Sequence, residues 1–378
     1  MLVSGHASAQ NTTTNPLTLQ SDSYLQAIGT QSFTYDTNPL MLTNGAKTLY
    51  GSVTAPELVL INTTPTSQLT LDGVVQKNVF NQSEFDSTDL HSKILFNTKN
   101  ERWSADLKQT IDYDTTRTSE FSNYGFTTAP VRHIGINVSP TIGFKPTATD
   151  TISLPASLTT SHYERRVFTD FTVMSVAPNL KHEFDPNNTG VFTLKAQRYR
   201  ATTGLRNIVD SVGPSIGWIR TISPLFSING NIGIQQSRQF GAVASRPWEL
   251  QYTFDGGLNY EDLQDRIQFT ARRANYAFGN GTESLLTSFG VSDTHKINPR
   301  LSVNFGLNYQ TADYQAQTTG SLETRMGGNG GITYLVTPHL DLTSTFQYRR
   351  ETLTNISQTA DSSIITIGIV FHPQAWDL

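Results

Sequence analysis

The chain has 378 residues, no cysteine and a formal net charge of −4, with 15% charged and 37% hydrophobic residues. The absence of cysteine excludes disulfides, thiolate metal sites and cysteine nucleophiles, and the small net charge argues against a nucleic-acid-binding surface. Charged residues are too few for a typical soluble surface, and apolar residues are too few for helical membrane spans. The composition fits a protein in which only alternate residues face lipid.

The first residues suggest an exported protein. Ala7-Ser8-Ala9 has the small-x-small pattern of a secretory cleavage site and is followed by Gln10, although the basic n-region and most of the apolar core are missing. We expect residues 1–9 to be the remnant of a signal peptide, with a start codon assigned too late. Residues 10–28 are polar and show no periodicity, so we expect a flexible periplasmic tail.

From Gly29 to Phe371 the chain alternates apolar with polar residues. Phe305 and Leu307, for example, alternate with Asn304 and Gly306. A period of two predicts strands with two different faces. The predicted strands lie at 29–37, 47–62, 66–80, 87–98, 101–114, 132–145, 150–163, 169–184, 189–201, 207–223, 225–238, 247–261, 265–277, 283–297, 300–313, 321–336, 339–351 and 362–372.

The links between these strands alternate in length. Short links rich in Pro, Asn and Asp, which preset turns, lie at 62–65, 98–101, 145–148, 185–188, 221–224, 261–264, 296–299 and 336–339. The intervening links are mostly longer, notably 115–131, 239–246, 312–320 and 352–361. This pattern is typical of a single transmembrane antiparallel up-and-down β-barrel. We predict an all-β barrel over 29–372 with about 18 strands (16 possible), both termini periplasmic, and residues 373–378 as a C-terminal tail.

Two features interrupt the strand pattern. Pro56, Pro140, Pro178 and Pro214 lie inside predicted strands, each after a small residue. Because a proline inside a strand marks an edge or a bulge, we predict a repeated hairpin with a shared bulge. The run Gly327-Gly328-Asn329-Gly330-Gly331 permits a sharp bend or a close backbone approach; we favour barrel curvature and keep a ligand contact as the alternative.

The early segment Tyr35-Asp36-Thr37-Asn38 and proline-bearing strands such as Val138-Ser139-Pro140 resemble the family called putative β-barrel porin 2, from about Gly29 onward. The resemblance implies an outer-membrane barrel and, because some members are associated with exopolysaccharide export, an exit pore for such a polymer. Members usually end on an aromatic residue that helps insertion. Here Phe371 closes the last strand, seven residues follow it, and Trp376 is the available substitute.

If the apolar face meets lipid, the other face lines the interior. Charges in a membrane span normally face water or one another, so we predict a pore lining that contains Asp72, Asp89, His91, Lys93, Arg102, Asp106, Lys108, Asp112, Lys181, Glu183, Lys195, Asp255, Glu323, Arg325 and Asp341. The signs are mixed, which argues against a selectivity ring of one sign. Two interpretations remain: cross-strand ion pairs that hold the barrel's shape, or a wet path for neutral polar solutes such as glycan.

Aromatic residues recur toward strand ends on the apolar register. Tyrosine and tryptophan prefer the membrane–water interface, and we predict an aromatic girdle of Trp103, Tyr113, Trp218, Phe226, Tyr252, Tyr260, Tyr309, Tyr334 and Tyr348. A path on which sugars stack would need inward aromatics, for which Phe80 and Tyr199 are the few candidates.

Catalytic chemistry finds little support in the sequence. Asp89 and His91 share a strand face, as an acid–base pair requires, but no nucleophile elbow accompanies them. The other histidines are scattered without metal-ligand spacing, and Gly279-Asn280-Gly281 is interpreted as a loop tip because no helix follows. We expect no enzyme activity, no metal site and no cofactor.

The predicted strand number leaves room for an aqueous passage. We therefore expect an outer-membrane channel of a Gram-negative bacterium, porin-like and in its specific form an exit pore for exopolysaccharide. The alternative is a non-conducting barrel that acts as a surface receptor, adhesin or scaffold through its outer loops. Segment 115–131 could fold inward or project outward. Expected partners are outer-membrane lipid, the barrel-insertion machinery, and periplasmic polysaccharide-export proteins with their polysaccharide cargo; nucleic acid is not expected.

Overall fold

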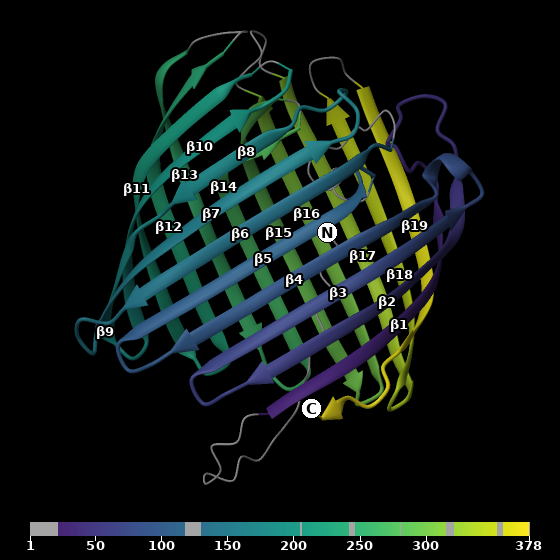
Figure 1. Cartoon of the computed structure of the whole chain (residues 1–378), viewed down its shortest axis with the longest axis horizontal. Helices are drawn as coiled ribbons and strands as arrows, with labels where there is room; N and C mark the ends of the chain where they lie inside the picture. Colours follow the sequence, from purple (N-terminus) through teal and green to yellow (C-terminus); the bar gives the residue numbers. More distant parts are fainter. Residues whose placement is uncertain are drawn as a thin grey trace.

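The chain forms one antiparallel sheet that closes on itself. In the computed structural model, residues 22–117, 130–204, 206–241, 246–279, 281–314, 321–353 and 358–377 are described. The first strand pairs with the second and also with β19, so that Tyr35 lies opposite both Tyr50 and Ile365. This double pairing closes the barrel seen in Figure 1.

The wall strands are β1 (Asp22–Asp36), β2 (Leu49–Thr63), β3 (Ser67–Phe80), β4 (Ser87–Lys99), β5 (Trp103–Thr115), β6 (Arg132–Phe144), β7 (Asp150–Tyr163), β8 (Phe171–Val176), β9 (Asn179–Asp185), β10 (Asn188–Ala201), β11 (Ile208–Ser223), β12 (Phe226–Phe240), β13 (Arg246–Glu261), β14 (Asp265–Phe278), β15 (Thr282–Asn298), β16 (Leu301–Tyr314), β17 (Ser321–Thr337), β18 (Leu340–Leu353) and β19 (Gln358–Phe371). Both β8 and β9 pair with β7 and with β10, so these two are halves of one strand. The barrel therefore has 18 strands, which confirms the predicted count.

Helical structure is almost absent from the described residues. They contain one short 3-10 turn, η1 (Ser83–Phe85), and no helix that is long and apolar enough to cross a membrane.

The two ends of the barrel differ in their connections. At one end, here called the turn rim, the strands are joined by links of two to five residues, such as 64–66, 186–187 and 338–339. The opposite end, the loop rim, carries longer links, such as 37–48 and 164–170, beside some short ones. β1 begins and β19 ends at the turn rim. That this rim faces the periplasm remains a prediction.

Two predicted boundaries at the chain ends require correction. β1 begins at Asp22, not at Gly29, so residues 22–28 belong to the barrel and not to the tail. The predicted C-terminal tail also contains strand β20 (Trp376–Asp377), in which Trp376 pairs with Leu25 of β1. The chain thus adds a short pairing at the turn rim, beyond the last wall strand.

The predicted proline bulge is wrong. On both sides of Pro56, Pro140 and Pro214 the pairing with the following strand keeps one register, as does the pairing of β8 and β9 with β10 across Pro178. A bulge would put an extra residue on one strand and shift the register. The prolines instead remove single N–H donors from a ladder that otherwise continues.

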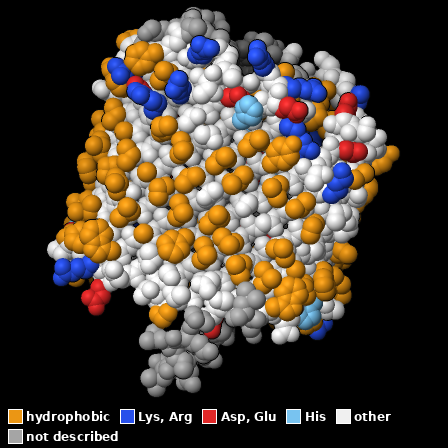
Figure 2. Space-filling model, viewed as in Figure 1, with side chains coloured by type: hydrophobic (Ala, Val, Ile, Leu, Met, Phe, Trp, Pro, Cys, Tyr) orange, Lys and Arg blue, Asp and Glu red, His pale blue; other side chains and the backbone are white. Residues whose placement is uncertain are grey.

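The two faces of the wall have different chemistry. Outward side chains such as Ile232, Leu250 and Phe305 are large, apolar and more than half exposed or close to it. Figure 2 shows apolar side chains over the middle of the outer surface, while charged side chains gather toward the two ends. Such a band is expected where a barrel meets lipid.

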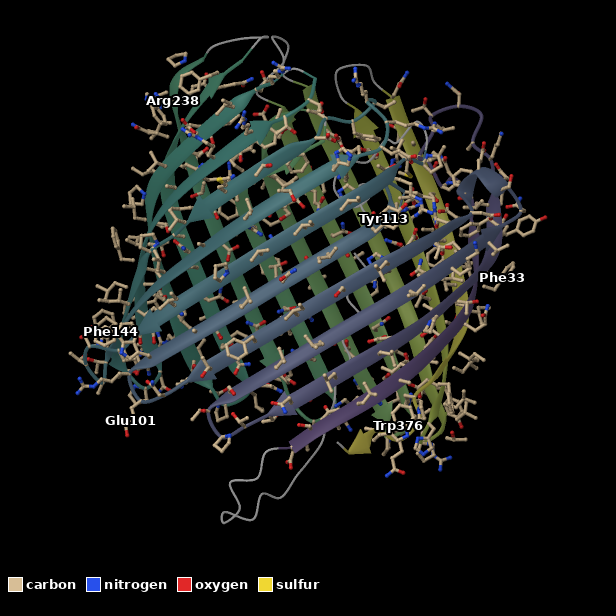
Figure 3. All side chains as sticks on the ribbon, viewed as in Figure 1. Phe33, Glu101, Tyr113, Phe144, Arg238 and Trp376 are labelled. Atoms are coloured by element: carbon tan, nitrogen blue, oxygen red, sulfur yellow. The ribbon has the colours of Figure 1, made fainter. Side chains whose placement is uncertain are left out.

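The predicted girdle residues lie on the outer face at two levels. Toward the turn rim are Trp103, Trp218, Phe226, Tyr260 and Tyr334, and toward the loop rim are Tyr113, Tyr252, Tyr309 and Tyr348. Near the turn rim, rings from neighbouring strands pack together: Trp103 lies 4.5 Å from Phe144 and Phe184 lies 5.1 Å from Trp218, centroid to centroid. Figure 3 shows Phe144 and Tyr113 toward opposite ends of the wall.

Candidate functional site: the lumen and its inward-folded hairpin

The inner face of the wall carries most of the predicted lining residues. Those that alternate with outward apolar side chains, and therefore face inward, are Asp72, Asp89, His91, Lys93, Asp106, Lys108, Asp112, Lys181, Glu183, Lys195, Asp255, Glu323, Arg325 and Asp341. Arg102 is different, because it lies exposed in the turn between β4 and β5 and not in a wall strand. The predicted strand 101–114 began two residues before β5 and therefore included Arg102.

Asp89 and His91 share a face but do not form an acid–base pair with each other. Asp89 is fully buried and accepts hydrogen bonds from Asn78 (2.8 Å) and Arg132 (2.9 Å). His91 Nδ1 lies 2.8 Å from Asp112 Oδ1 on the neighbouring strand. These cross-strand contacts agree with the first of the two sequence interpretations, in which ion pairs between strands hold the barrel's shape.

A second charged cluster lies on the inner face of β17, β18 and β1 near the loop rim. Arg325 donates to Glu323 and, at 3.3 Å, to Glu351. Arg349 donates to Asp36 at 3.1 Å. All five side chains are buried or nearly so, and each carboxyl group lies beside an arginine, as buried charges require.

Charges nearer the turn rim are more exposed. Asp255 and Arg272 lie 3.6 Å apart and are both more than half exposed. Asp72 stands opposite Lys93 in the β3–β4 register. The described wall is therefore lined by charges of both signs and not by a ring of one sign.

The hairpin of β14 and β15 leaves the wall at the loop rim. Pairing between β13 and β14 stops at Phe254 and Arg273, whereas β14 and β15 stay paired to their tip. At this tip successive residues are buried on both faces: Glu283 is 5%, Ser284 1% and Leu285 4% exposed. A wall strand would expose one face to lipid, so this tip lies inside the barrel.

The contacts of the tip identify the surface that it covers. Glu283 accepts hydrogen bonds from Gln197 and, at 3.4 Å, from Ser211, and Asn275 donates to Ser237 at 3.2 Å. Gln197, Ser211 and Ser237 are inward-facing residues of β10, β11 and β12. The hairpin therefore folds across the inner face of three strands and narrows the lumen on that side.

The glycines at the tip permit a close approach to the opposite loops. Gly279 O accepts a hydrogen bond from Thr169 N–H, at 2.6 Å, and Gly281 O accepts one from Asn207, at 3.0 Å. Gly281 has a φ of +86°, which favours glycine, and a Cβ at Gly279 would stand 2.7 Å from Tyr163 Oη. Gly279 and Gly281 are thus at a loop tip docked inside the barrel, and Asn280 between them lies outside the described residues.

The inward aromatics considered for sugar stacking are buried under these elements. Tyr199 is fully buried and packs with Phe171, at 5.5 Å between ring centroids, beside Ala277 of the hairpin. Phe80 packs with Leu49 and Phe85. Neither ring offers an open face to a solute.

Segment 115–131 can be followed only at its ends, because residues 118–129 lie outside the described residues. Thr116 N–H donates to Val131 O at 2.8 Å, which extends the β5–β6 ladder. The Arg117 guanidinium lies 4.9 Å from the ring centroid of the inward-facing Phe80. The described start of this link therefore leans over the inner face.

A ladder of carboxamides follows the inner face of β16 and β17. In the register, Asn304 lies opposite Gly331, Gly306 opposite Asn329, and Asn308 opposite Gly327. A Cβ on any of these glycines would overlap the facing carboxamide oxygen. The glycine run thus makes room for asparagine side chains, a role that neither of the two sequence interpretations contained.

The three asparagines of this ladder, Asn304, Asn308 and Asn329, are exposed on the lumen side. Within the described part of the chain they form no hydrogen bond. Each carboxamide keeps two donors and an acceptor that can bind water or a solute.

Sequence reasoning missed Asn275 and Glu283 as functional residues. Both lie on the register of Phe269 and Phe289, which face lipid lower in the same hairpin. A glutamate that faces lipid is costly. A glutamate at a position where the alternation predicts a lipid-facing side chain was therefore the signal in the sequence that the hairpin leaves the wall.

Comparisons with known proteins agree with this architecture. Residues 266–372 match the model of the family described as Putative beta-barrel porin 2, which confirms the resemblance for that part of the chain. A search of curated proteins finds no match.

Several solved structures share the fold. A BenF-like porin from Pseudomonas fluorescens Pf-5 superposes with a TM-score of 0.51 and 10% identity over 92% of this chain and 99% of that chain. Pseudomonas aeruginosa OccK5 (OpdH) gives 0.50 and 10% over 93% and 99%, and Acinetobacter baumannii OccAB1 gives 0.50 and 8% over 93% and 97%. At such identities the likeness concerns the fold alone.

Proposed function

We propose that this porin-like β-barrel channel, which lies in the outer membrane of Gram-negative bacteria, passes small, uncharged polar solutes. The observation that carries the proposal is the unpaired ladder of Asn304, Asn308 and Asn329, together with a wall whose charges are of both signs. Carboxamides exchange hydrogen bonds with hydroxyl groups without attracting an ion of either sign. The β14–β15 hairpin narrows the entrance, which favours small molecules over folded or bulky ones.

The test uses the full chain in planar bilayers and in liposomes. We expect conduction of potassium chloride with weak ion selectivity, and faster liposome swelling with arabinose than with gluconate. A hydrogen bond contributes a net of about 0.5–1.5 kcal/mol. If a passing solute holds one such bond to the ladder at a time, a variant carrying Asn304→Ala, Asn308→Ala and Asn329→Ala should slow arabinose uptake by roughly two- to twelvefold.

A matched control removes an inward asparagine that does not face a glycine. Asn97→Ala meets this condition, because Asn97 lies opposite Gln68 and Asp106. It should leave arabinose uptake unchanged. Equal uptake by the ladder variant and the Asn97 variant would reject the solute class, and an electrically closed bilayer would reject the channel and favour the receptor, adhesin or scaffold.

A second candidate is the exit of an exopolysaccharide, with periplasmic polysaccharide-export proteins as partners. The carboxamide ladder favours it as well, since it runs along the strands and could serve successive sugars of one chain. The docked hairpin argues against it, because a polymer would need that hairpin to move. Loss of surface polysaccharide in a deletion strain would support this cargo, and an unchanged surface would exclude it.

A further inference from the structure

The outer face of the loop rim carries a cationic cluster that the transport of solutes does not use. Its members, here called the arginine patch, are Arg198 and Arg200 of β10, Arg238 of β12 and Arg273 of β14. All four lie on the register of the lipid-facing residues of their strands. Figure 3 places Arg238 at the upper left, and Figure 2 shows Lys and Arg side chains gathered there above the apolar band.

One carboxylate organises the patch. Arg198, Asp210 and Arg238 lie directly opposite one another across β10, β11 and β12. Asp210 accepts from Arg198 at 2.6 and 3.0 Å and from Arg238 at 3.3 Å. Arg200 is exposed on the same face and forms no ion pair within the described residues. Arg198 and Arg238 thus share one acid, and with Arg200 and Arg273 the patch has an excess of positive charge.

Aromatic rings of the outer face contact two of the guanidiniums. Arg238 Cζ lies 4.6 Å from the Trp248 centroid and 4.5 Å from that of Phe240. Arg273 Cζ lies 4.3 Å from the Tyr252 centroid. Stacking orders a guanidinium, and Arg273 is held further by a hydrogen bond from Nη1 to Thr287 (3.1 Å), as Arg238 is by its bond from Nη2 to Asp210. The other Nη group of each arginine is left for a ligand. The patch is therefore built in advance of any ligand.

The surface immediately below the patch is strongly apolar. Toward the turn rim, Ile216 of β11 is 61% and Ile234 of β12 53% exposed, and on β13 Leu250, between Trp248 and Tyr252, is 68% exposed. A surface with cations beside and above apolar side chains is complementary to a lipid, whose anionic head group lies above its acyl chains. Guanidinium forks pair best with phosphate or carboxylate, and basic clusters at a membrane surface attract anionic lipid.

We propose that the arginine patch binds the phosphate groups of an anionic lipid in the membrane leaflet that meets the loop rim. The lipid's acyl chains lie along Ile216, Ile234 and Leu250. The site lies outside the lumen, so the proposal of lipid binding does not depend on which solute the barrel transports.

The test measures binding of diphosphoryl lipid A to the purified, delipidated full-length barrel in detergent, by native mass spectrometry. We expect a variant carrying Arg198→Gln, Arg238→Gln and Arg273→Gln to lose at least tenfold in affinity. Monophosphoryl lipid A should bind the native barrel more weakly, and millimolar inorganic phosphate should not displace lipid A. A heat-modifiable band on a gel verifies that each variant is folded.

Two kinds of control keep the outcome decisive. Arg220→Gln removes an outward arginine near the turn rim, and Arg350→Gln removes one on β18; neither should change binding. If the triple variant does not fold, a second variant that carries Arg198→Gln, Arg238→Gln and Asp210→Asn removes all three charges of this ion-paired group together. Retained lipid A binding in a folded patch variant, or displacement by inorganic phosphate, would overturn the proposal.

Discussion

Glu283 of β15 accepts a hydrogen bond from Gln197 of β10, although four strands separate β10 from β15 in the wall. Two wall residues so far apart can meet only if one of them leaves the wall. The contact therefore shows that the β14–β15 hairpin lies inside the lumen. A few hydrogen bonds hold the hairpin in this position, and mutation can remove them.

Glu283→Ala should release the hairpin and raise single-channel conductance. The substitution removes the hydrogen bonds from Gln197, Ser211 and Asn275. Each hydrogen bond to a charged group contributes up to about 3 kcal/mol to the stability of the docked hairpin. Conductance in planar bilayers is the measurement. Glu261→Ala is the control, because Glu261 is an exposed residue at the turn rim, where it pairs with Arg266 at the start of β14, far from the tip of the hairpin.

Locking the hairpin should have the opposite effect. Asn275 Nδ2 lies 3.2 Å from Ser237 Oγ, and the chain contains no cysteine, so a variant with Asn275→Cys and Ser237→Cys holds a single thiol pair. Its oxidised form should keep low conductance even with Glu283→Ala, and reduction should restore the higher level. Identical traces before and after reduction would show that the hairpin does not control the passage.

Gly327→Ala should destabilise the barrel because the new Cβ would overlap Asn308 Oδ1. Overpacking in a core typically costs about 1–3 kcal/mol; the exposed Asn308 carboxamide can turn away, so the cost should lie below that range, and the double variant with Asn308→Ala should recover most of it. Urea unfolding followed by tryptophan fluorescence measures both. Gly230→Ala is the control, since nothing lies within 4 Å of a Cβ there; equal losses at both glycines would contradict the ladder.

The wall could be predicted because its determinants are local. Alternation between Asn304 and Phe305 fixes which face each residue occupies, and turn residues such as Pro186 and Pro299 mark where strands reverse. Strand number and most boundaries follow from these two signals. The additional residues of β1 before Gly29 were missed because they carry little alternation and depend on pairing with β2.

The interior could not be predicted in the same way. Glu283 meets Gln197, Ser211 and Asn275 through contacts between strands that are remote in sequence, and period two states only which side a residue faces. The proline bulge failed for a related reason: Pro178 removes a donor, but whether the register shifts depends on β7 and β10, its neighbours. Both the position of the hairpin and the register at Pro178 depend on contacts between strands, which the alternation along one strand does not specify.

The assignment of inner and outer faces is tested by two adjacent positions of β16. Phe305 is an outward residue, 50% exposed, whereas Asn304 faces the lumen. An arginine on the lipid face costs about 2–4 kcal/mol at the bilayer midplane, so Phe305→Arg should lower the free energy of unfolding by that amount in lipid vesicles. Asn304→Arg places the same charge in water, and its long side chain can extend away from Gly331 into the lumen, so it should cost much less. Because the two variants carry the same new residue in neighbouring positions, strand propensity and net charge cancel in their difference, and equal destabilisation would reverse or abolish the assignment of the two faces.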